Sequence, residues 1–147
     1  MLVIKRIESG SKDSVKLYSL RQSLLTLPQH CGLLQFNDVY IYDDSVYAVS
    51  SDVMNYGNIL HFLRKQRLPC LTEREASDGV LVIANALRVL HQAGHVHGRI
   101  HPGSVLMDKR ERSGCTIKLQ GLHGCVKKSE SDIRICPQKS LFFPPEI

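Results

Sequence analysis

The chain has 147 residues, of which 43% are hydrophobic and 22% charged, and this composition excludes a largely disordered chain and favours one soluble domain or part of one. Its net charge of +5 is small and its basic residues are scattered, so we expect no nucleic-acid partner. There is no run of about 18 apolar residues, so we expect no membrane span. The five cysteines are widely spaced, which predicts reduced thiols and a location in the cytoplasm, or alternatively the nucleus.

The first third of the chain predicts a small sheet with one helix. The apolar, β-branched run MLVIKRI predicts a strand, which the turn-rich residues ESGSKD end. Apolar residues at three- and four-residue steps predict a helix over residues 14–27, which Pro28 stops. Residues 39–42 and 46–49 predict a hairpin with its turn at Asp43-Asp44-Ser45.

Two further helices are predicted in the middle of the chain. A short helix follows Gly57-Asn58 and ends before Pro69. Thr72 and Glu75 have the spacing of a capping box, which predicts the start of a long helix over residues 73–93 that Gly94 closes.

The long helix is predicted to be apolar on more than one side. Its main stripe comprises Ala76, Val80, Ile83, Ala84, Leu87 and Leu90. Leu81, Val82 and Val89 lie outside this stripe, so we expect the helix to pack between neighbours. Where no neighbour covers it, we expect the chain to self-associate through this exposed apolar face.

The last third predicts a polar loop, two strands and a long loop. VLMD and TIKLQ predict strands joined by the charged loop KRERSG, and the residues from GLHG onwards predict a loop. Four histidines at the end of the long helix and in the polar loop raise the hypothesis of a zinc site: His91, His95, His97 and His101. Gly94 ends the helix between the first two, so we expect no metal site.

Several landmarks, in order along the chain, resemble the protein kinase family. His97-Gly98-Arg99 falls on the H-R-D of the catalytic loop and Ser104 on its asparagine. In this pattern His91 and His97 are structural, so the resemblance implies that His97 is a buried structural histidine. Gly121-Leu122-His123 falls on D-F-G, and Pro144-Pro145-Glu146 falls on A-P-E. Upstream, Val3-Ile4-Lys5 falls on V-A-I-K, and VYAVSSDVMNYGNI resembles the last strand of the small lobe, the hinge and the start of the next helix.

This resemblance implies an α+β fold, a partial protein kinase-like domain over residues 1–147. Residues 1–52 would form the small-lobe portion, an antiparallel sheet with one helix. Residues 53–147 would form the start of the helical large lobe through an activation-segment-like loop. It implies that a bound nucleotide would contact Lys5, Ser51 and Val53, and the alternative for Lys5 is an ordinary lysine at the edge of a strand. The glutamate that usually pairs with the strand lysine falls near Arg21, so the usual ion pair is absent and two cations would face each other.

The resemblance also implies that the chemistry is lost. Phosphoryl transfer needs a carboxylate to orient the attacking hydroxyl, another to hold magnesium and an asparagine for a second metal. Arg99 stands at the position of the carboxylate that orients the hydroxyl, and it cannot act as a general base. Gly121 stands at the position of the metal-binding carboxylate, and Ser104 at that of the asparagine. His101 replaces the lysine that steadies the γ-phosphate.

We therefore expect a catalytically inactive, pseudokinase-like module with a regulatory role and a protein partner, no metal, and weak ATP binding at most. The alternative is a divergent serine/threonine or tyrosine kinase that binds ATP and transfers phosphate.

Overall fold

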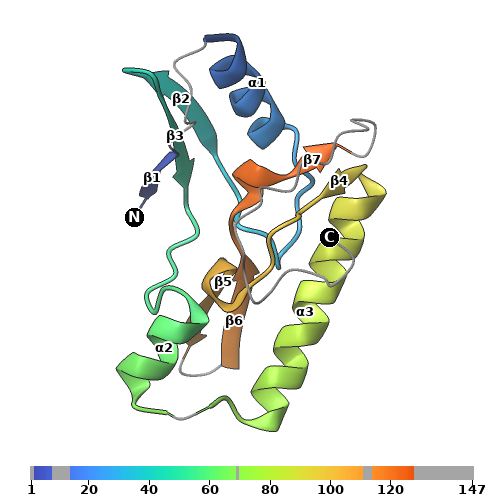
Figure 1. The fold of residues 1–147 in the computed structure, drawn as a ribbon. Coiled ribbons are helices and arrows are strands. Elements are labelled where there is room, and N and C mark those ends of the chain that lie inside the picture. Colours follow the sequence, from blue (N-terminus) through green and yellow to red (C-terminus); the bar gives the residue numbers. More distant parts are fainter. Residues whose placement is uncertain (1, 8–13, 69, 111–113, 128–147) are drawn as a thin grey trace.

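The computed structural model describes residues 2–7, 14–68, 70–110 and 114–127, and it confirms the α+β class (Figure 1). At one end, β1 (Val3–Ile7) and β2 (Asp38–Tyr42) flank β3 (Ser45–Ser50) in an antiparallel sheet of order β1-β3-β2. The helix α1 (Ser14–Leu25) packs on this sheet. The core between them is apolar and comprises Ile7, Leu17, Leu24, Val39, Val46 and Ala48.

Local chemistry sets the ends of these elements. The helix α1 ends two residues before the predicted Leu27, and the Thr26 hydroxyl donates to the carbonyl of Gln22 at 3.0 Å, where it satisfies a terminal acceptor. The predicted hairpin is confirmed. Asp43 and Asp44 both have positive φ, as a two-residue hairpin turn requires, and Ser45 pairs with Tyr42 as part of the strand.

The other end of the molecule is built from two helices and a hairpin. They are α2 (Ile59–Gln66), α3 (Glu73–Gln92), β5 (Val105–Arg110) and β6 (Gly114–Leu119). The capping box is confirmed, because Thr72 and Glu75 exchange side-chain to backbone hydrogen bonds in both directions. Gly94 follows the end of α3 with φ +76° and its N–H bonds the His91 carbonyl, which confirms the predicted C-terminal glycine.

The predicted stripe of α3 is partly wrong. Leu90 is buried as expected, but Val80 is 70% exposed and Ala84 is also exposed. The helix instead turns Gly79 and Ala86 inward. A Cβ added to Gly79 would lie 2.8 Å from Cδ1 of Ile117, so this glycine allows the strand β6 to approach the helix closely. A pattern of large apolar residues cannot reveal a face that is defined by a glycine.

Two short strands were missed in segments predicted as loops. The strand β4 (His95–Val96) pairs antiparallel with β7 (Val126–Lys127), and the short helices η1 (Pro102–Ser104) and η2 (Leu122–Gly124) precede β5 and β7. Two-residue strands are too short to produce an alternating pattern. The predicted break ESGSKD, the tip of KRERSG and Pro144-Pro145-Glu146 lie outside the described residues. No helix of the described chain is long and apolar enough to cross a membrane.

Candidate functional site

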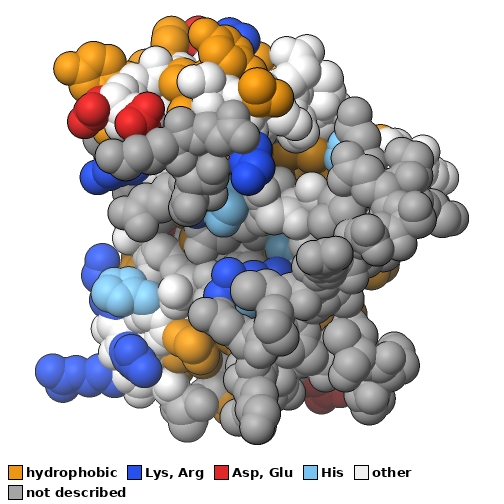
Figure 2. Space-filling model, turned by 45° about the horizontal axis from the view of Figure 1, so that its top comes forward, with side chains coloured by type: hydrophobic (Ala, Val, Ile, Leu, Met, Phe, Trp, Pro, Cys, Tyr) orange, Lys and Arg blue, Asp and Glu red, His pale blue; other side chains and the backbone are white. Residues whose placement is uncertain are grey.

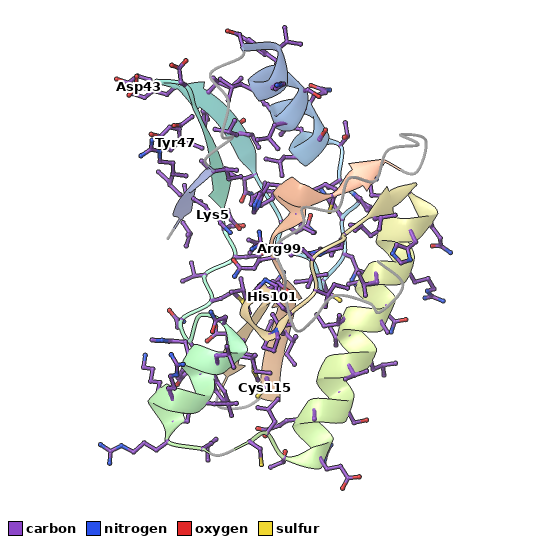
Figure 3. The ribbon with its side chains drawn as sticks, in the orientation of Figure 1. Lys5, Asp43, Tyr47, Arg99, His101 and Cys115 are labelled. Atoms are coloured by element: carbon purple, nitrogen blue, oxygen red, sulfur yellow. The ribbon has the colours of Figure 1, made fainter. Side chains whose placement is uncertain are left out.

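The candidate site lies where the loop after β4 meets the end of β6, and Gln120 joins the two. Its backbone N–H donates to the Ser104 carbonyl at 2.8 Å and its side-chain amide donates to the Gly103 carbonyl at 2.9 Å. Its side-chain oxygen accepts from Lys5 Nζ at 3.2 Å, which connects β1 to the same point. In Figure 3, Lys5, Arg99 and His101 lie one below the other between the sheet and the β5–β6 hairpin.

His97 is the buried structural histidine that the sequence predicted. Its Nε2 lies 2.9 Å from the carbonyl oxygen of Gln120, and its Nδ1 lies 3.3 Å from the backbone nitrogen of Arg99. The backbone N–H must donate, so Nδ1 accepts and Nε2–H donates to the carbonyl, which defines a neutral imidazole. Burial lowers the pKa of His97, against the opposing effect of the bond to Gln120 and with a further lowering by His101.

Ser104 and His101 hold one another instead of facing a ligand. The Ser104 hydroxyl donates to the His101 carbonyl at 2.7 Å and accepts from the His101 N–H at 3.0 Å. The His101 ring accepts from the Gly103 N–H at 3.1 Å, so it caps η1. Both side chains therefore stabilise the conformation of this loop.

Gly121 adopts a left-handed backbone with φ +90°. An added Cβ would lie 3.6 Å from Cε1 of His97, which is ordinary van der Waals contact. The position therefore has room for a side chain, but a glycine stands there, two residues after the end of β6.

The side chain of Lys5 extends from β1 to Gln120, which precedes Gly121. Desolvation by burial lowers its pKa. Arg21, which the sequence predicted to face Lys5, instead bonds β2. Its Nε donates to the Val39 carbonyl at 2.8 Å. Among the described residues, Lys5 forms no ion pair with a carboxylate and bonds the Gln120 side chain instead.

Positive charge dominates this part of the molecule. On the face in Figure 2, blue and pale-blue side chains lie across the middle and the red acidic side chains lie toward the margins. Partial desolvation, followed by the nearby Lys5, Arg99 and His97, lowers the pKa of His123. A cluster in which cations disfavour one another's charge is suited to anions and unsuited to a divalent metal.

The donor set does not fit magnesium, which the kinase resemblance implies. Mg²⁺ requires oxygen ligands, and carboxylates hold it in most sites. Here Gly121 has no side chain, Arg99 is a cation, and the Ser104 hydroxyl is used by His101. No group of three His, Cys, Asp or Glu side chains that could hold a metal occurs within the described ranges.

Ser51 and Val53, the other expected nucleotide contacts, lie in the segment that follows β3. The Ser51 N–H donates to the Asn37 side-chain oxygen at 2.7 Å, so that backbone donor is already used. Both residues line a polar pocket against the β5–β6 hairpin. The structure therefore brings Arg99, His101, Ser104, Gly121 and Lys5 together around Gln120, and places Ser51 and Val53 in a different set of contacts.

Gln120 is the residue that sequence reasoning missed. It was assigned only as the end of a strand, because glutamine carries no charge and matches no motif letter. The signal that could have found it is its place between a buried strand and Gly121, where a polar side chain needs partners.

Comparison with known proteins adds independent findings. A family model described as protein tyrosine and serine/threonine kinase matches residues 1–143. Ribosomal protein S6 kinase alpha-2 of Mus musculus is 33% identical over 103 residues, which are 70% of this chain and 13% of that protein. Ribosomal protein S6 kinase alpha-6 of Homo sapiens is 30% identical over 116 residues, 79% of this chain and 15% of that protein.

A relative with a different description also matches. The STE20-related kinase adapter protein strd-1 of Caenorhabditis elegans is 23% identical over 126 residues, 86% of this chain and 31% of that protein. The chain thus spans between about an eighth and a third of the length of these relatives.

Proposed function

This chain belongs to the protein tyrosine and serine/threonine kinase family, and we propose that it is a catalytically inactive member that acts as a protein-interaction or regulatory module. The observation that carries the proposal is the chemistry around Gln120. A kinase must orient a hydroxyl and neutralise transferred phosphate with metal. Arg99, Ser104 and Gly121 stand at the positions that the family uses for these tasks, and none of them supplies a carboxylate.

The structural roles of these residues support the same proposal. Ser104 and His101 bond each other and close the loop, and His97 ties the loop to Gln120. The loop is therefore kept in shape by bonds that do not depend on a nucleotide. A site whose described residues supply no carboxylate for a metal fits recognition better than catalysis, and an adapter role is the one that the name of the nematode relative carries. We place this role in the cytoplasm, with the nucleus as the alternative, and assign residues 1–52 and 53–147 to the two lobes.

The proposal predicts that ATP binds weakly and that Mg²⁺ does not strengthen the binding. The physical reason is that Lys5 and its neighbours can attract phosphate, while none of the described residues at this site places a carboxylate to hold the metal. Thermal-shift titrations with ATP, with and without MgCl₂, measure this, and the two titrations should coincide.

A matched pair of variants tells binding at this site from general salt effects. Lys5→Met should remove whatever shift ATP produces, and Lys16→Met, on the exposed side of α1, should not. A rise in Tm that depends on Mg²⁺ and is lost in Lys5→Met would contradict the proposal.

A divergent kinase that binds ATP and transfers phosphate is the second candidate. It is favoured by Lys5, which stands on β1 as the strand lysine of the family does and reaches Gln120 beside Gly121. It is also favoured by the names of the S6 kinase relatives. This candidate needs a carboxylate from elsewhere to replace the lost ligands, and the Mg²⁺-dependence of ATP binding separates the two.

A further inference from the structure

Asp108 is an acidic side chain on β5 that is only 8% exposed. In the β5–β6 hairpin it pairs with Thr116, and Leu106 pairs with Lys118, so these four side chains share one face. Met107 and Ile117 form the pair between them and point into the core on the opposite face. Within the part of the chain that the structure describes, the Asp108 carboxylate has neither a hydrogen-bond donor nor an ion-pair partner.

The carboxylate faces a polar pocket of about 410 Å³ between the hairpin and the segment after β3. The pocket is lined by Ser51, Asp52, Val53, Met54, Asn55, Asp108, Thr116 and Lys118. Its walls offer a carboxylate, a threonine hydroxyl and the polar groups of a connecting segment, a composition suited to a ligand with several hydrogen-bond donors.

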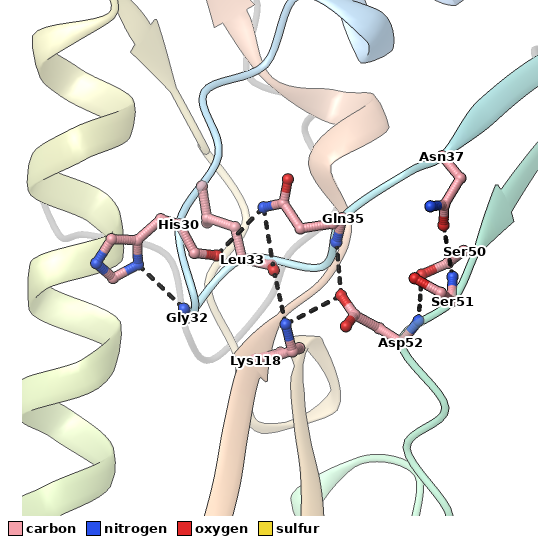
Figure 4. A network of polar contacts seen from close by, with 9 residues as sticks. All are labelled: His30, Gly32, Leu33, Gln35, Asn37, Ser50, Ser51, Asp52 and Lys118. Carbon is pink, nitrogen blue, oxygen red and sulfur yellow. Dashed lines mark hydrogen bonds and ion pairs between the residues drawn. The ribbon is translucent and has the colours of Figure 1, made fainter.

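Lys118, the cation in this pocket, is already paired. Its Nζ lies 3.0 Å from the Asp52 carboxylate and 3.5 Å from the Leu33 carbonyl oxygen (Figure 4). Asp52 also accepts from the Gln35 N–H at 2.9 Å, so this pair joins three segments of the chain. The charges of Lys118 and Asp52 cancel, so no described side chain of this pocket offsets the negative charge of Asp108.

A nearly buried carboxylate without a partner is unusual. Buried charges in proteins are almost always paired or hydrogen-bonded, because removing them from water is costly. Functional sites are where such groups persist at the expense of stability. A metal ion is a poor candidate for the missing partner, because the described residues provide no set of three ligands around it.

We propose that this pocket accepts the guanidinium group of an arginine from a protein partner. A guanidinium is planar, permanently charged and weakly hydrated, and its fork of N–H donors matches a carboxylate in two parallel bonds. The Thr116 hydroxyl stands beside Asp108 as a further acceptor for this group. The inference rests on the proposed role in protein interaction, and it names the chemistry that the partner must carry.

The test uses the 147-residue chain, ¹⁵N-labelled, and N-acetyl-arginine-N-methylamide as the probe. Titration should shift the amide signals of Ser51 to Asn55 and of Asp108, and the blocked citrulline of the same shape, which has no charge, should not. Asp108→Asn should weaken binding at least tenfold. Asp44→Asn, in the exposed β2–β3 turn, should leave it unchanged.

The stability of the Asp108→Asn variant distinguishes a binding group from a structural one. If the carboxylate is kept for a ligand, removing its charge should raise the Tm of the free chain by about 2–4 °C. A lower Tm would overturn the proposal, as would equal binding of the arginine and citrulline probes. An alanine-flanked peptide with one arginine should bind at least as tightly as the blocked amino acid, and failure of the peptide to bind would exclude a protein source. Phosphoryl transfer by the chain would contradict the proposed inactivity and leave these titrations unaffected.

Discussion

The imidazole of His97 shows how single residues hold the site. Both of its ring nitrogens are used, one by the Gln120 carbonyl and one by the Arg99 N–H, and the second bond exists only when Nδ1 carries no proton. The family motif predicted that this histidine is structural, and the structure confirms it. The partner of Lys5 could not be predicted in this way, since which neutral side chain a lysine reaches depends on how two segments far apart in sequence pack.

His97 predicts a dependence of stability on pH. Its pKa in the folded chain is lowered from the ordinary 6.5, so the unfolded chain takes up this proton first as the pH falls. The contribution is fully present above pH 6.5 and is lost as the pH falls from there through the folded pKa. Urea unfolding of the chain at a series of pH values should show the free energy of unfolding declining in this window.

Variants assign the decline to this residue. His97→Gln keeps an amide donor for the Gln120 carbonyl and should flatten the decline below pH 6.5, and His61→Gln, exposed on α2, should retain the slope of the unchanged chain. His123, whose pKa is also lowered, should contribute to the decline in the same direction. Identical slopes in the two variants would show that His97 is not held neutral.

At the scale of elements, α3 has two apolar faces and the structure buries one of them. Gly79, Ala86 and Leu90 face the hairpin and loop, while Val80 and Leu81 are 70% and 62% exposed. Beside them, Ala84, Leu87, Arg88, His91 and Gln92 line a shallow groove of about 550 Å³. Fully burying a Val or Leu side chain contributes about 1.5–3 kcal/mol, so this surface favours contact with another protein surface.

We propose that a second copy of the chain covers this surface, with the two α3 helices antiparallel. The N-terminal half of the helix carries Glu73, Glu75 and Asp78 with one cation, Arg74, which pairs with Asp78, and the C-terminal half carries Arg88. An antiparallel pair therefore brings opposite charges together along its length. Light scattering coupled to size-exclusion chromatography should give a mass above 16.6 kDa that rises with concentration.

Substitutions on α3 locate the contact. The double variant Val80→Gln/Leu81→Gln should be a monomer. Its free energy of unfolding should fall by no more than about 0.5 kcal/mol, because both side chains are exposed. Tyr18→Gln, equally exposed on α1, should leave the mass unchanged. A monomer at every concentration of the unchanged chain would contradict the proposal.

For the whole molecule, the order of elements and the class of fold were predictable, and the contacts between distant segments were not. Strong signals such as the Thr72 capping box and the Asp43-Asp44 turn are local, so the sequence alone locates them. The β4–β7 pair and the bond from Lys5 to Gln120 join residues far apart in the chain and have no local pattern. The substituted motif positions were identified from the family pattern, and Gln120 and Asp108 emerged only from packing.

We propose that the chain cannot transfer phosphate, because the described residues of its site supply no carboxylate for a metal or for the attacking hydroxyl. Gly121→Asp offers a demanding variant. The left-handed backbone at this position is better tolerated by Asp than by most residues, and the added Cβ is in ordinary contact with His97. Arg99 would still occupy the position of the base, so one restored carboxylate should not restore the reaction.

The most direct measurement is transfer of the γ-phosphate of labelled ATP, in the presence of Mg²⁺, to the chain itself and to a mixed library of serine, threonine and tyrosine peptides. We expect no incorporation above a protein-free control, for the unchanged chain and for Gly121→Asp alike. Mg²⁺-dependent incorporation by the unchanged chain that Lys5→Met abolishes would contradict it.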